Sequence, residues 1–193
     1  TRVKLSSNKN PHLAWSDAPE QTQSFVVLCV DATAPTDAAD VNQTDREVPA
    51  ELPRADFSHW VLINIPATMH EISAGQFSHE VTPKGKAGPV IAGQKDSPIR
   101  HGINDYTHWF AGDHDMAGDY YGYDGPCPPW NDSLVHQYTF TVYALDVAEL
   151  ALPADGKLNI EVVQRQMQEH ILASASWSGV YTLTPRLAAG LAI

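Results

Sequence analysis

The sequence is poor in cysteine, in charged residues and in long apolar runs, and each shortage argues against a class of protein. Its two cysteines lie far apart, Cys29 in an apolar run and Cys127 between prolines, so neither a disulfide framework nor a zinc site is indicated. Only 18% of the residues are charged and 43% are hydrophobic, which argues against a disordered chain. No apolar run approaches the roughly 18 residues of a membrane-spanning helix.

Positive charge is scarce as well. The chain has 12 Lys and Arg against 23 Asp and Glu, a formal net charge of −11. Such a surface repels a phosphate backbone and an anionic membrane, so we do not expect nucleic acid as a partner. The segment Thr1–Leu5 lacks the apolar centre of a signal peptide, which favours a cytoplasmic location. The periplasm is the alternative if a signal has been removed.

The apolar pattern predicts four strands and one helix. The predicted strands are Ser24–Asp31, His59–Ile65, Gln137–Leu145 and Trp177–Leu183. Apolar residues at three- and four-residue steps predict a helix that begins after Asn159 as N-cap and reaches Ile171. The strands come early and the helix late, without the alternation of a parallel α/β sheet. We therefore expect a single mainly β domain over residues 1–193.

Polar residues fall at the ends of the predicted strands. Asp31 ends the first strand, His59 opens the second and His136 precedes the third. The segment Tyr123–Pro129 contains three prolines, which make it rigid and suited to a pocket wall. If these strand ends converge, the two imidazoles can hold an oxyanion, and Asp31 can orient or charge one of them. Taken singly, each of these residues also fits a structural role.

Three sequence blocks carry a resemblance to a known family. They are Asn10–Trp15 followed by Asp31–Pro35, then His59–Pro66, then Tyr123–Pro129 followed by His136–Asp146. In order and residue type these blocks resemble the phosphatidylethanolamine-binding proteins, also called Raf kinase inhibitor-like proteins, in their bacterial form. The resemblance spans most of the chain.

This resemblance implies a mainly β fold, in which a large antiparallel sheet packs on a smaller sheet with a few peripheral helices. It also implies a small pocket for phosphate or a phosphoryl head group. Carried over position by position, the ligand-binding residues are Asp31, His59, Gly125, Pro128, His136 and Tyr138. The implied function is that of a non-enzymatic binding protein, a kinase or protease inhibitor or regulator, with no cofactor and no metal. The resemblance also implies a protein partner and a homodimer.

The sequence departs from the family pattern in three places. Thr33 replaces the second aspartate of the first motif, which leaves one carboxylate where the family has two. Gln137 replaces the arginine after the motif histidine, so a cation that pairs with carboxylates is missing. The stretch Asp40–Phe57 is longer than in compact members, and we expect it to reshape the pocket rim. All three departures bear on the choice of ligand.

The alternative function is a hydrolase or lyase that uses the same His/Asp pocket. Ser58, Ser133 and Cys127 are the candidate nucleophiles, but the Gly-x-Ser-x-Gly elbow is missing from the sequence. Neighbours on a strand point to opposite faces, so Ser58 and His59 cannot form a nucleophile–base pair directly. The neutral surroundings of Cys127 favour an inert thiol.

A metal site is a further alternative in the segment that carries His108, Asp113, His114 and Asp115. These residues do not follow a standard ligand spacing. We therefore expect the four side chains to be mostly exposed and to bind no transition metal.

Overall fold

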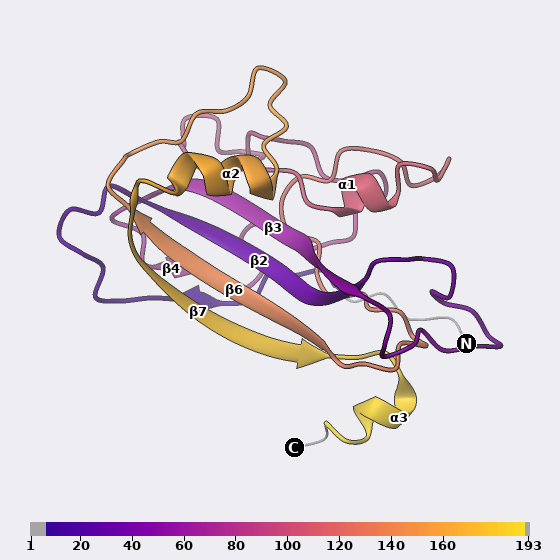
Figure 1. Cartoon of the computed structure of the whole chain (residues 1–193). Helices are drawn as coiled ribbons and strands as arrows, with labels where there is room; N and C mark the ends of the chain where they lie inside the picture. Colours follow the sequence, from indigo (N-terminus) through magenta and orange to yellow (C-terminus); the bar gives the residue numbers. More distant parts are fainter. Residues whose placement is uncertain (1–6, 192–193) are drawn as a thin grey trace.

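The structure is a computed structural model and describes residues 7–191. A five-stranded antiparallel sheet, in the order β5-β3-β2-β6-β7, lies beside a two-stranded sheet, β1-β4 (Figure 1). The strands are β1 (Leu13–Ala14), β2 (Ser24–Pro35), β3 (Arg54–Pro66), β4 (Glu71–Ile72), β5 (Arg100–His101), β6 (His136–Leu145) and β7 (Ile171–Tyr181). The helices are α1 (Tyr106–Trp109), α2 (Ile160–Met167) and α3 (Pro185–Ala188). The predicted mainly β architecture, a large sheet packed on a smaller one, is confirmed.

Apolar residues cover both faces of the large sheet at its centre. Successive residues of β2 alternate between two cores: Val27 belongs to the first core, and Leu28 to the second. The first core contains the fully buried Trp60 of β3 and Ile72 of the small sheet, while the second contains Val163 of α2. A strand buried on both faces needs a continuous apolar run, which is what the sequence of β2 provides.

A β-bulge in β3 decides where His59 points. Cys29 and Val30, which are consecutive on β2, pair with Trp60 and Ser58, so His59 is an extra residue without a partner on β2. Bulges bend a strand and re-aim the side chain at the irregularity. The bulge lets His59 share a face with Tyr138 of β6, with ring centroids 5.2 Å apart, while Ser58 pairs with Val30.

The structure corrects two predicted boundaries. The predicted helix ends at Met167 and does not reach Ile171, which opens β7 and pairs with Leu145. The last strand therefore spans Ile171–Tyr181 and not Trp177–Leu183. Ile171 follows Met167 by four residues, so its helical spacing is a coincidence that periodicity alone cannot recognise.

The long irregular stretch before β6 contains α1 and β5. His108, Asp113, His114 and Asp115 are exposed there, as the sequence predicted. In the part of the chain that the structure describes, we find no helix that has both the length and the apolar character needed to cross a membrane.

The N-terminus of α2 provides a test of the fold assignment. The side chain of Asn159 accepts a hydrogen bond from the backbone N–H of Val162, at 3.0 Å, which satisfies one free donor of the first turn. We expect Asn159→Ala to lower the free energy of unfolding by about 1 kcal/mol in urea denaturation. Asn159→Asp, which keeps the acceptor, should cost much less. Equal losses for the two variants would contradict the capping role.

Candidate functional site

A cavity of about 180 Å³ lies where β2, β3 and β6 meet. Register explains the convergence, because Asp31 of β2 pairs with Tyr138 of β6 on one side and with Phe57 of β3 on the other. Five of the six residues predicted for the site line this one cavity: Asp31, His59, Pro128, His136 and Tyr138. The strand ends converge as expected.

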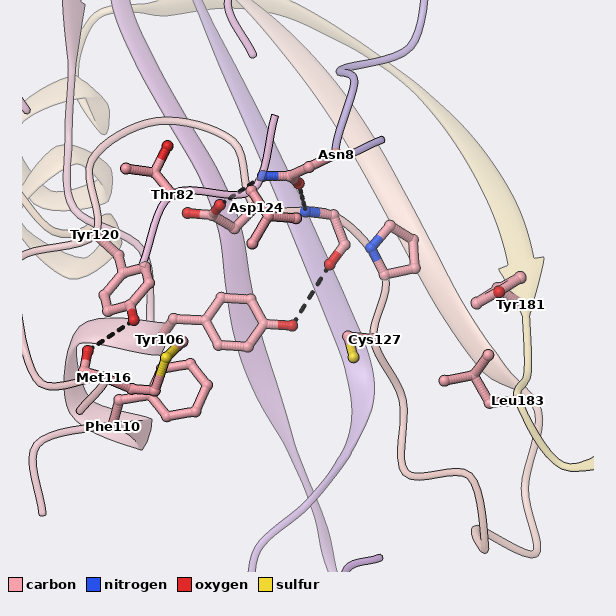
Figure 2. Close-up of a pocket in the computed structure, with 13 residues that line it drawn as sticks. Asn8, Thr82, Tyr106, Phe110, Met116, Tyr120, Asp124, Cys127, Tyr181 and Leu183 are labelled. Carbon is pink, nitrogen blue, oxygen red and sulfur yellow. Dashed lines mark hydrogen bonds between the residues drawn. The ribbon is translucent and has the colours of Figure 1, made fainter. Parts of the chain in front are cut away.

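Gly125 does not line this cavity but a neighbouring one, which shares Tyr106, Phe110 and Cys127 with the first. Its N–H donates to the side-chain oxygen of Asn8, at 2.8 Å, and its carbonyl accepts from the Tyr106 hydroxyl at 3.4 Å. These bonds fix the backbone of Gly125 beside the neighbouring cavity. Figure 2 shows this second cavity, where Tyr106 and Cys127 lie between Phe110 on one side and β7 on the other.

Two carboxylates clamp the buried imidazole of His136. Its Nδ1 lies 2.6 Å from Oδ2 of Asp31, and its Nε2 lies 3.0 Å from Oδ2 of Asp132. Arg54 completes the chain, since its two terminal nitrogens donate to the two oxygens of Asp132, at 2.7 and 3.0 Å. All four side chains are largely buried. Two negative and two positive charges thus form a neutral network below the cavity.

The network shifts the pKa values of its members in the directions that these contacts require. Burial alone would lower the pKa of His136, but hydrogen bonds and charge from Asp132 and Asp31 outweigh it and raise the pKa to about 8. Burial opposes ionisation of Asp132, yet the His136 and Arg54 contacts lower its pKa to about 2. For Asp31, burial is likewise outweighed by hydrogen bonds from His136 and Thr33, and its pKa is lowered. At neutral pH His136 is therefore an imidazolium.

This geometry corrects the expectation that His136 donates directly to a ligand. Both of its ring nitrogens are already used by carboxylates, so its contribution to the site is charge and position. The structure also corrects the expectation, based on Thr33 and Gln137, that the pocket lacks a second carboxylate and a cation. Asp132 supplies a second carboxylate and Arg54 supplies a cation, although neither falls on the family motif positions.

His59 has a different environment from His136. Its Nδ1–H donates to the backbone carbonyl of Asp124, at 2.7 Å, which leaves Nε2 with a lone pair in the neutral ring. Among residues 7–191 this Nε2 has no hydrogen-bond partner, and neither does the hydroxyl of Tyr138. Burial lowers the pKa of His59, against the smaller opposing effect of the Asp124 carbonyl. His59 Nε2 and the Tyr138 hydroxyl are therefore two polar groups available to a ligand.

Asp124, whose carbonyl fixes His59, is itself held by three donors. Its Oδ1 accepts from Asn8 at 2.8 Å and from Lys86 at 2.7 Å, and its Oδ2 accepts from Asn104 at 2.8 Å. These bonds fix the backbone that selects the His59 tautomer.

Aromatic rings and the long insertion form the walls of the cavity. Phe57 lies 5.0 Å from Tyr106 and 6.3 Å from Trp109, measured between ring centroids. Val41 and Asn42, from the Asp40–Phe57 stretch, line the cavity. The side-chain amide of Asn131 holds the rim, because it donates to the backbone carbonyls of three insertion residues, Asp40, Gln43 and Arg46.

The candidate nucleophiles are poorly placed for catalysis. Ser58 lies on the face of the sheet opposite to His59, beside Val30. The hydroxyl of Ser133 donates to the carbonyl of Val48, at 2.6 Å. Cys127 is exposed and lines the cavity, but partial desolvation by the surrounding protein raises the pKa of its thiol, so it is protonated at neutral pH. Within residues 7–191, no group of three or more His, Cys, Asp or Glu side chains is arranged to hold a metal ion.

A large antiparallel sheet packed on a smaller one, with a small pocket at its strand ends, defines a class of mainly β proteins, and comparisons place the chain in one family of this class. The family model for phosphatidylethanolamine-binding protein matches residues 3–182. A UPF0098 protein of Aquifex aeolicus is 32% identical over 172 residues, covering 89% of this chain and 73% of that protein. UPF0098 protein YbhB of Escherichia coli is 30% identical, covering 91% and 82%.

Solved structures agree with the sequence relatives. The crystal structure of E. coli YbcL, described as a member of the mammalian PEBP family, has a TM-score of 0.59 at 27% identity, covering 91% of this chain and 80% of that one. A homologue from Chlamydia trachomatis, at 24% identity and a TM-score of 0.57, shares the fold. The chain belongs to the phosphatidylethanolamine-binding protein family.

The clamp on His136 predicts how stability varies with pH. A pKa raised from 6.5 in the unfolded chain to about 8 in the fold stabilises the protein fully below pH 6.5, and this gain is lost as the pH rises through 8. We expect this contribution of His136 to the free energy of unfolding, measured in urea, to fall by about 2 kcal/mol between pH 6 and pH 8.5. The buried rings of His59 and His101, whose pKa values are lowered, contribute with the opposite sign over the same interval, so the His136 contribution is read from the difference between variants.

Asp132→Asn serves as the control for this measurement, since it removes one of the two charges that raise the pKa of His136. Over the same pH interval, the free energy of unfolding of this variant should fall less, or rise more, than that of the wild-type protein, whatever its absolute stability. An identical pH dependence in the two proteins would mean that His136 does not contribute to it.

Proposed function

We propose that the protein binds phosphate or another phosphoryl-type anion in the cavity above His136, without turning it over. The observation that carries this proposal is the pair of unused polar groups, His59 Nε2 and the Tyr138 hydroxyl, above a buried imidazolium. Because the neutral charge network contains Asp31, that carboxylate does not repel an entering anion as an isolated charge would. The cavity, at about 180 Å³, suits a small head group.

The tautomer of His59 determines the protonation state in which the anion binds. A neutral His59 presents a lone pair to the cavity, and a fully ionised dianion also presents only lone pairs. One proton must therefore lie between them, either on a monoprotonated phosphate or on His59 itself. Inorganic phosphate already carries such a proton at neutral pH, whereas an anion without one, such as sulfate, requires His59 to take up a proton, and its binding then becomes tighter as the pH falls.

Family membership supports a binding role, and the finer expectations from the sequence form part of the same proposal. We infer a cytoplasmic protein that regulates a kinase or protease partner by binding, and that forms a homodimer. We do not propose the hydrolase or lyase alternative, because Ser58 and Ser133 are turned away from the cavity and the Cys127 thiol is protonated.

Calorimetry with two anions tests the proposal. Sulfate stays a dianion between pH 5 and pH 8, so any tightening of its binding as the pH falls must come from protonation of the protein. We expect sulfate to bind more tightly at pH 5.5 than at pH 7.5, and phosphate to bind at both. Tyr138→Phe should weaken phosphate binding by roughly 1 kcal/mol, or about fivefold, which is the scale of one hydrogen bond.

His59→Gln is the variant that identifies the titrating group. Its amide can donate to an anion at any pH, so sulfate binding should lose its pH dependence. Phosphate that fails to bind the wild-type protein would contradict the proposal, as would sulfate binding that strengthens with rising pH.

A further inference from the structure

A second polar recess lies on the opposite face of the large sheet, between β3, α1 and α2. Its volume is about 500 Å³. Figure 1 shows the first turn of α2 directed toward α1 along this side of the sheet. Val30 and its β3 partner Ser58 both line the recess, while the bulge turns His59 to the other face. The recess is therefore separate from the anion pocket.

Three carboxylates line this recess: Asp56, Asp105 and Glu161. Among the described residues, no lysine or arginine lines it, and His108 is the basic side chain that does. Within residues 7–191, Asp56 and Glu161 have no hydrogen-bond or ion-pair partner. Burial, and to a smaller extent the charge of Glu161, raises the pKa of Asp105. The recess thus concentrates negative charge without the compensation found around His136.

A buried hydroxyl without a partner provides an independent observation at the same place. Ser58 is 2% exposed, and its Oγ has no hydrogen-bond partner in the described part of the chain. Only its backbone is used there, since its N–H donates to Oδ2 of Asp105, at 2.7 Å. A buried hydroxyl that lacks a partner loses its hydration without replacement, which is unfavourable. A ligand in the recess could satisfy it.

We propose that this recess binds a small aliphatic polyamine. Three carboxylates and a free hydroxyl offer acceptors to a ligand that carries several N–H donors and a matching positive charge. The apolar side chains of Val30 and Ile160, which also line the recess, can contact the methylene segments between the ammonium groups. The recess thus offers the negative charge, the hydrogen-bond acceptors and the apolar contacts that such a ligand needs.

An organic cation fits this recess better than a metal ion. Metal ions need oxygen ligands within roughly 2.0–2.6 Å of one point, whereas ammonium groups bind acceptors separately at about 2.7–3.2 Å. Among the residues described, the carboxylates of this recess do not form a group able to hold a metal ion. Acceptors that are spread around a cavity of this size match several separate ammonium groups.

Spermidine is the probe, and its binding is measured by calorimetry at low ionic strength. The test variant is Asp105→Asn combined with Glu161→Gln. The matched control is Glu20→Gln combined with Glu149→Gln, since both residues are exposed and lie outside the recess. Each double variant removes two negative charges, so the net charge changes equally, from −11 to −9. Nonspecific attraction of spermidine to the acidic surface therefore weakens by the same amount in both.

We expect the recess variant to bind spermidine at least about tenfold more weakly than the wild-type protein, and the control to change by less than about twofold. Ser58→Ala should weaken binding severalfold while the melting temperature stays equal or rises, because a hydroxyl without a partner is removed. This single variant keeps the test valid if the double variant is unfolded. Equal weakening in the recess and control variants, no effect of Ser58→Ala, or no binding by the wild-type protein would each overturn the proposal.

Discussion

The placement of one imidazolium between two buried carboxylates is the interaction on which the candidate site depends. His136, at the start of β6, contacts Asp31 of β2 and Asp132 of the preceding turn, and Asp132 is in turn paired with Arg54 at the start of β3. Removing any one member would leave a buried charge without compensation, which is far costlier than replacing the whole set. The clamp therefore fixes three strand ends around one cavity, in which we propose that His59 and Tyr138 contact the anion directly.

The bulge in β3 gives the two faces of the sheet different chemistry. It directs His59 into the cavity that we propose for an anion, while Ser58 lines the recess that we propose for a polyamine. The charges around each of these two residues suit the ligand proposed there. Charges cancel beneath the anion cavity, whereas carboxylates without cationic partners surround Ser58. A strongly acidic chain can hold an anion only where its own negative charges are paired.

Local pattern predicted the elements, and five of the six residues predicted from the family motifs line the cavity. Ser24–Asp31 was recognisable because a strand buried on both faces requires an unbroken apolar run. Asp132 and Arg54 were missed because their contact joins residues 78 positions apart, and both lie outside the motifs. The error at Ile171 arose from a helical spacing that continued by coincidence into β7. That Gly125 lines the neighbouring cavity could not be predicted, because its backbone bonds to Asn8 and Tyr106 leave no signature in sequence.

The protonation states of the two pocket histidines test the account most directly. Nitrogen-15 NMR of the imidazole rings at pH 7, with and without phosphate, distinguishes an imidazolium from each neutral tautomer. The account predicts that His136 is doubly protonated in both samples, and that free His59 is neutral with its proton on Nδ1. Only the His59 signals should move when phosphate binds. A neutral His136, or a change of its protonation on phosphate binding while His59 is unaffected, would contradict the account.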